Sequence, residues 1–249
     1  MKARFLAALL LLAALNASAL AQDGPRDAAT AQDAAQALQL YLQRTAQSGA
    51  RPDYTKPPAA DLFGHVFDLS ALNALPPPQA DDLPWLLAWG VAVDQSYKGI
   101  LLFGLPLDQN LDPAAIRRNM ADYEDQYAAA LDFMVRFQAR LAETTIQILD
   151  ALPPNERTAP RAAGLQQTRI GATQTIHGAL TAIARIEKPA NARLISGALR
   201  DTRALWAKYL IPGDRTNLID LLARMPKATM DQAVKNNLAA FAAALAAAQ

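Results

Sequence analysis

Helical periodicity runs through almost the whole chain and is interrupted only where proline or glycine occurs. No stretch alternates apolar and polar residues as a half-buried β-strand does. We therefore expect an all-α fold, a single-domain bundle of about seven or eight helices. The expected helices span residues 26–49, 61–75, 81–104, 112–152, 155 or 158 to 186, 190–210, 216–225 and 228–247.

The ends of these helices carry recognisable signals. Ser48-Gly49 is expected to stop the first helix, because glycine adopts the left-handed conformation that ends helices. Asp112-Pro113 supplies a cap and a first-turn proline for the longest helix. Asp81 or Asp82 is expected to cap the helix over 81–104 in the same way.

The segment 81–104 is the most apolar one after the N-terminal region, and it could be mistaken for a membrane span. Asp94, Gln95 and Lys98 occupy its middle, where a charge in lipid costs about 2.5–3.5 kcal/mol. We therefore expect it to be the central helix of the core, apolar nearly all round.

The first residues have the layout of a secretory signal peptide. Lys2 and Arg4 precede the apolar run Phe5–Leu15, and small residues follow up to Ala21. That run is shorter than the roughly 20 residues of a membrane-spanning helix. We expect cleavage after Ala21 and a periplasmic or secreted protein beginning at Gln22.

The mature region, residues 22–249, is expected to form one α-helical domain, with the first helix and loop over 22–60 attached more loosely. Residues 22–150 hold seventeen acidic and nine basic residues, and residues 151–249 hold six acidic and thirteen basic ones. Opposite charges predict that the two halves pack together. The small net charge of the whole chain argues against nucleic-acid binding.

Catalytic and metal-binding signatures are missing from the sequence. The chain has no cysteine and two histidines, and it contains no H-E-x-x-H or G-x-S-x-G motif. We expect no catalytic residue, metal site or cofactor. Local motifs do not detect a glycosidase-type pair of carboxylates, because its two members can lie far apart in the sequence. An enzyme is therefore the less favoured class.

Charged residues of the helix over 112–152 fall on one stripe at helical spacing. Acids alternate with arginines there, as they do on solvated helix faces, whereas a site for hard cations gathers oxygens without interleaved cations. We interpret the stripe as a solvent-exposed face. Its members are Arg118, Asp122, Asp125, Asp132, Arg136, Arg140 and Glu143.

A ligand pocket is predicted beside the most apolar helix, where aromatic side chains accompany a few polar groups. The alternative is that Asp94 and Lys98 form an ion pair where the helix leaves the core, and that His177 is solvated. The candidate ligand-binding residues are Trp85, Trp89, Asp94, Tyr97, Lys98 and His177.

Small residues recur at a spacing of four and three on the helix that ends near 186. Mid-helix glycine costs roughly 0.5–1 kcal/mol relative to alanine, and close contact with another helix can compensate for that. We expect a close-packed seam against the helix over 112–152, with a second subunit as the alternative partner. The seam residues are Gly164, Thr168, Gly171, Thr175, Gly178 and Ala182.

These observations favour a secreted or periplasmic binding or interaction protein whose partner is a protein or small molecule. One alternative is an enzyme or small-ligand carrier that uses the aromatic-lined pocket. Another is a protein that associates with the envelope surface, without spanning the membrane, through its basic C-terminal half. Assembly into a homo-oligomer is left open.

Overall fold

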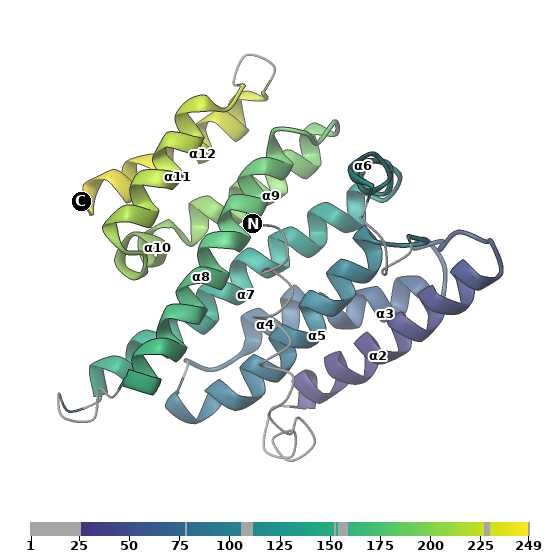
Figure 1. Cartoon of the computed structure of the whole chain (residues 1–249), viewed down its shortest axis with the longest axis horizontal. Helices are drawn as coiled ribbons and strands as arrows, with labels where there is room; N and C mark the ends of the chain where they lie inside the picture. Colours follow the sequence, from purple (N-terminus) through teal and green to yellow (C-terminus); the bar gives the residue numbers. More distant parts are fainter. Residues whose placement is uncertain are drawn as a thin grey trace.

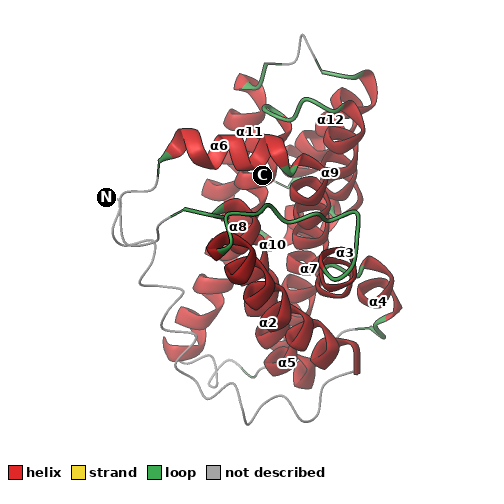
Figure 2. Ribbon diagram, turned by 90° about the vertical axis from the view of Figure 1, so that its right-hand side faces the viewer, coloured by secondary structure: helices red, strands yellow, loops and turns green. Residues whose placement is uncertain are grey.

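The computed structural model describes residues 26–77, 79–105, 112–151, 153, 159–226 and 230–248. This part of the chain is helical and contains no strand, which confirms the all-α prediction (Figure 2). The predicted signal peptide over 1–21 and the predicted helix start at Asn155 or Thr158 lie outside the described residues. The elements are α2 (Arg26–Gln47), α3 (Ala59–Val66), α4 (Leu69–Ala74), the short 3-10 helix η1 (Ala80–Asp82), α5 (Leu83–Leu101), α6 (Pro113–Asp122), α7 (Glu124–Ala151), α8 (Ala159–Ile183), α9 (Pro189–Asp201), α10 (Arg203–Tyr209), α11 (Pro212–Arg224) and α12 (Gln232–Ala247).

Three of the expected helices are each broken in two, so the described residues hold more helices than the seven or eight expected. Asp68 accepts hydrogen bonds from the backbone of Ser70 and Ala71 and thereby starts α4 as a separate helix. Tyr123 leaves helical geometry (φ −119°, ψ 36°) between α6 and α7, and Thr202 does so (φ −96°, ψ 3°) between α9 and α10. None of these breaks contains proline or glycine, so the sequence gives no signal that the helix ends there.

Helix α7 lies in the middle of the molecule and is buried on both sides (Figure 1). Phe133 and Phe137 join the apolar cluster formed with α2–α5. Leu131 and Val135 join a second cluster, formed with α8–α12. The expectation that residues 81–104 form the central helix is therefore wrong, because α7 contributes buried residues to both clusters, whereas the buried apolar residues of α5 belong to the first cluster.

Helices α2 and α5 form the N-terminal side of the molecule. The apolar stripe predicted for the first helix, Ala31, Ala35, Leu38 and Leu42, is buried. Gly49 has a φ of +69° just after α2, as a helix-ending glycine requires. Helix α5 packs between α2 and α7. Within the described ranges, none of the helices combines the length and the hydropathy of a membrane-spanning segment.

Capping residues behave as expected at one helix and differently at another. Asp112 accepts a hydrogen bond from the backbone of Ala114 at 2.8 Å, which confirms its role as the cap of α6. Asp82 makes no capping hydrogen bond to α5. Its carboxylate instead accepts hydrogen bonds from the backbone of Gln79 and the indole of Trp85.

Helices α8–α12 form the C-terminal side. Helices α8 and α9 both pack on α7, and α12 packs on α9, α10 and α11. Arg215 is buried and donates hydrogen bonds to the carbonyl oxygens of Leu210 and Ala248. Since carbonyls at helix ends lack intrahelical partners, Arg215 fastens the ends of α10 and α12 together.

The acidic and basic halves of the sequence meet where α7 packs on α9. The Glu124 carboxylate accepts hydrogen bonds from the backbone of Glu187 and Lys188, each at 2.9 Å, and from the side chain of Asn191. Lys188 also pairs with Asp125 at 2.8 Å. The prediction that the oppositely charged halves pack together is confirmed by these contacts.

Candidate functional site

The two tryptophans of the predicted pocket are part of the apolar core. Trp89 is fully buried, and Trp85 retains 7% of its accessible surface. The ring of Trp89 lies 5.4 Å from that of Phe137 and 5.8 Å from that of Phe133. These rings occupy the space in which a ligand would have to bind.

The polar members of the predicted pocket make contacts of other kinds or are exposed. Asp94 and Lys98 form an ion pair at 2.5 Å, as the alternative interpretation expects. The ring of Tyr97 stacks on that of Tyr127, and burial raises the pKa of its phenol well above its usual value. His177 is exposed on α8. The groove between α9 and α12 contains none of the six predicted residues.

The glycines of α8 do not make the predicted close contact. A Cβ atom added at Gly164, Gly171 or Gly178 would meet no atom within 4 Å. The side of α8 that packs in the core instead carries Ile176, Leu180 and their neighbours. The predicted seam is therefore not confirmed at its glycines, because they lie beside the buried stripe of the helix.

Other members of the predicted seam do make contacts. Ala182 is buried in the core, and the hydroxyl of Thr168 lies 2.6 Å from that of Tyr209. Tight glycine contacts occur on α5 instead. A Cβ at Gly90 would lie 3.1 Å from Phe137 Cε1, and one at Gly99 would lie 3.2 Å from Leu42 Cδ1.

The charged stripe of α6 and α7 is only partly a solvent-exposed face. Asp122 and Asp125 are exposed and pair with Arg51 and Lys188. Asp132 has 1% of its surface accessible, which contradicts its prediction as a solvated residue. The break at Tyr123 changes the helical register, and α9 then covers this side of α7.

A groove of about 540 Å³ lies between α9 and α12. Arg193 and Arg200 line it from α9, on either side of Gly197, and Asn236 and Asn237 line it from α12. Positions 193, 197 and 200 share one helix face because they are spaced by four and three residues. A Cβ added at Gly197 would meet no atom within 4 Å, so the floor of the groove is open.

The free polar atoms of the groove's side chains are hydrogen-bond donors. Asn236 Oδ1 accepts a hydrogen bond from Gln232, and no residue in the described ranges accepts one from its Nδ2. Asn237 uses its oxygen to accept from Arg200 and its nitrogen to donate to Ser196. The described residues that line the groove include no carboxylate.

Both arginines of the groove retain N–H groups for a ligand. A guanidinium carries five N–H donors. Arg200 donates to the Asp201 carboxylate with Nε and Nη2 and to Asn237 with Nη1, which leaves two N–H groups. Arg193 donates from Nε to the carbonyl of Pro189, and its terminal nitrogens have no partner within the described parts of the chain. The groove therefore suits an acceptor-rich, negatively charged group.

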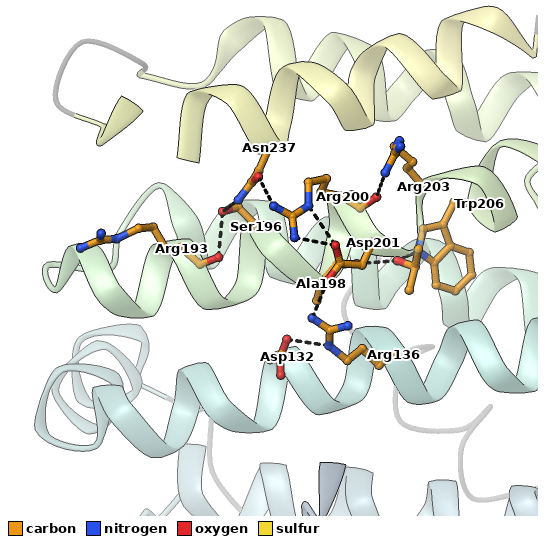
Figure 3. Close-up of polar contacts among 11 residues, drawn as sticks. Asp132, Arg136, Arg193, Ser196, Ala198, Arg200, Asp201, Arg203, Trp206 and Asn237 are labelled. Carbon is orange, nitrogen blue, oxygen red and sulfur yellow. Dashed lines mark hydrogen bonds and ion pairs between the residues drawn. The ribbon is translucent and has the colours of Figure 1, made fainter. Parts of the chain in front are cut away.

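A chain of alternating charges connects the groove to the core (Figure 3). Asp201 lies between Arg200 and Arg136, with contacts of 2.6 Å and 3.0 Å. Arg136 also contacts the buried Asp132 at 3.0 Å. These contacts hold Arg200 in place at the edge of the groove.

The two carboxylates of this chain have opposite pKa shifts. Burial raises the pKa of Asp132 above its ordinary value, since Arg136 contacts only one of its oxygens and the other has no partner in the described structure. Burial also acts on Asp201, but hydrogen bonds from Arg200 and Arg136 outweigh it and lower its pKa. Asp201 is thus a competing anion beside Arg200.

Sequence reasoning missed this groove. The spacing of Arg193, Gly197 and Arg200 in RLISGALR does indicate a shared face. The second wall comes from Asn236 and Asn237 on α12, which is separated from α9 in the sequence by α10 and α11, and no local pattern shows that α12 packs there. No protein-family model, curated protein or solved structure matches this chain, so its candidate site is defined by its own residues.

Proposed function

We propose that the protein is an exported α-helical binding protein that holds an anionic group of its ligand in the groove between α9 and α12. One observation carries this proposal: the groove's free side-chain polar atoms are donors, on Arg193, Arg200 and Asn236, around an open floor at Gly197. A carboxylate or phosphate accepts hydrogen bonds from such donors and pairs with the guanidinium charge of Arg193 or of Arg200.

The sequence supports the exported location. Lys2 and Arg4, the apolar run Phe5–Leu15 and the small residues up to Ala21 together form a signal-peptide pattern. N-terminal sequencing of the protein recovered from the periplasm or the medium tests this part. We expect Gln22 as the first residue, and retention of Phe5–Leu15 in the mature protein would contradict it.

Ligand binding is tested by titrating the protein with small anions. The protein is titrated with inorganic phosphate and with succinate while its thermal unfolding is followed, because a ligand that binds the folded state raises the midpoint. Native mass spectrometry of protein purified from its own compartment reports retained ligands and stoichiometry. We expect a saturable rise of several degrees with at least one of the two anions.

Gly197→Leu is the informative variant, because its side chain enters the groove where no atom lies within 4 Å of the Cβ position. It should remain folded and lose the anion-dependent rise. Gly178→Leu is the matched control, since Gly178 is also an open helical glycine but lies on α8. The proposal fails if neither anion raises the midpoint of the wild type, or if Gly197→Leu responds as the wild type does.

A further inference from the structure

We infer that the ligand of the α9–α12 groove is an acidic peptide segment in extended conformation, with two carboxylates that bind Arg193 and Arg200. This inference rests on the proposed function of the groove as an anion site. It is carried by the distance between the two arginines, by the shape of the groove between them and by the direction of their side chains.

Arg193 and Arg200 are seven residues apart on α9, which places them about 10 Å apart along the helix axis. Their side chains are held apart as well. Arg193 donates back to the carbonyl of Pro189, whereas Arg200 is held by Asn237 and Asp201. Figure 3 shows the guanidinium of Arg193 extending along α9 away from Arg200. A single carboxylate or phosphate cannot contact both groups, but a ligand with two separated anionic groups can.

The space between the arginines fits a peptide backbone. Gly197 on α9 and Ala233 on α12 line the groove at that point, so no long side chain prevents close approach. The Nδ2 group of Asn236, whose oxygen is bound by Gln232, is available to donate to a peptide carbonyl. An extended chain can therefore pass between α9 and α12 and be recognised at its backbone and at two side chains.

The charge distribution favours a peptide over larger polyanions. Among the described residues, Arg193 and Arg200 are the only cations that line the groove, and Asp201 pairs with Arg200. Nucleic-acid binding draws on many phosphate contacts, and an anionic membrane attracts clusters of four to eight cations on an exposed surface. Two arginines in a concave groove match two carboxylates of a short segment.

Asp201 competes with the ligand for Arg200. Its carboxylate accepts from Nε and Nη2 of Arg200 at 2.9 Å and 2.6 Å. When a ligand carboxylate approaches, Asp201 still has Arg136 as a partner at 3.0 Å. Removing the charge of Asp201 should therefore strengthen binding, whereas a residue with a purely structural role would not have this effect.

The experiment measures fluorescence anisotropy of labelled ten-residue peptides that carry two glutamates, separated by one to seven positions, in a Gly-Ser-Ala background. Because an extended chain advances about 3.3 Å per residue and residues an even number of positions apart face the same side, affinity should be highest when the glutamates are four positions apart. The best peptide should bind about tenfold tighter than its single-glutamate version, and added salt should weaken binding.

Two variants and a matched control test which residues contact the peptide. Arg193→Gln should abolish the advantage of the second glutamate, and Asp201→Asn should tighten binding severalfold. Arg224→Gln is the matched control, since Arg224 is an exposed arginine of α11 that does not line the groove. Circular dichroism checks that each variant remains folded.

The outcomes separate this inference from the proposed function. Binding that Gly197→Leu abolishes but that does not depend on glutamate spacing would overturn the two-carboxylate peptide and leave the anion site intact. Failure of all peptides, of phosphate and of succinate to bind would overturn both. Binding of phosphatidylglycerol vesicles that Arg193→Gln abolishes, with no peptide bound, would assign the groove to a membrane surface instead.

Discussion

The two sides of α7 are packed in different ways. On the side of α2–α5, four aromatic rings form a cluster, those of Phe67, Trp89, Phe133 and Phe137. The centroids of neighbouring rings in this cluster lie 5.4–5.8 Å apart. On the side of α8–α12, the core is mainly aliphatic, and polar side chains bridge α7, α9 and α12 at its edge. Dense aromatic packing leaves little free space, whereas the second side keeps an open groove.

Glycines show the same difference. A Cβ added at Gly90 on α5 would lie only 3.1 Å from the Phe137 ring, whereas Gly171, Gly178 and Gly197 on the other side face open space. A small residue therefore marks a close helix contact only where a bulky partner lies opposite. Regular spacing along one helix, as in α8, carries no information about that partner.

The largest expected effect tests whether the two sides unfold together. Phe133→Ala removes a fully buried ring and should lower the free energy of unfolding by about 3–5 kcal/mol. Leu199→Ala, in the other cluster, should cost about 2–5 kcal/mol. Urea unfolding followed by circular dichroism and tryptophan fluorescence should show one transition in both variants, because α7 borders both clusters.

The tryptophans make this test sensitive to each side. Trp85 and Trp89 report on the first cluster and Trp206 on the second. If Phe133→Ala unfolded in two separate steps, the two sides would be independent units, and α7 would not couple them.

An intermediate effect is expected at the contact between the two sides. Glu124→Ala leaves the backbone N–H groups of Glu187 and Lys188 and the amide of Asn191 without their acceptor. We expect a loss of about 2–3 kcal/mol at pH 7, measured by urea unfolding. Asp122→Asn, at an exposed ion pair with Arg51, should cost well under about 1 kcal/mol.

The effect of Glu124 should depend on pH. Burial raises its pKa, but the hydrogen bonds from Glu187, Asn191 and Lys188 outweigh burial and leave the pKa below its ordinary value. A carboxyl whose pKa is lowered in the folded state stabilises the fold above its unfolded pKa and loses that contribution as the pH falls through its folded pKa. The difference between wild type and Glu124→Ala should thus shrink below about pH 4. A difference that stays constant down to pH 2 would contradict a charged Glu124 as the stabilising species.

Glycine substitutions have small expected effects, but they test the difference between the two sides most sharply, because the expected change in stability has opposite signs on α8 and α5. Gly171→Ala should stabilise the protein by about 0.5–1 kcal/mol, since alanine favours the helix and meets no neighbour. Gly90→Ala should destabilise it by about 1 kcal/mol, because the new Cβ would press against the buried Phe137 ring. Thermal unfolding of both variants measures this. A lower midpoint for Gly171→Ala would indicate a close helix contact on α8.

Local sequence signals predicted the local structure well. The periodicity of Ala31, Ala35, Leu38 and Leu42 placed the buried face of α2, and Asp112-Pro113 placed the start of α6. Both depend on contacts within one or two helical turns, so the residues that decide them are neighbours in the sequence. The breaks at Tyr123 and Thr202 were missed because each residue leaves helical geometry without a proline or glycine to signal it.

The candidate site, in contrast, depends on which helices meet. The sequence by itself determined an all-helical chain with oppositely charged halves and with Arg193, Gly197 and Arg200 on one face. The tertiary structure alone decided that Asn236 and Asn237 lie opposite that face, that Asp132 is buried under α9, and that the glycines of α8 face open space. The physical reason is that helical periodicity indicates which side of a helix is apolar but not which helix packs against it. That partner is decided by packing between segments far apart in the chain.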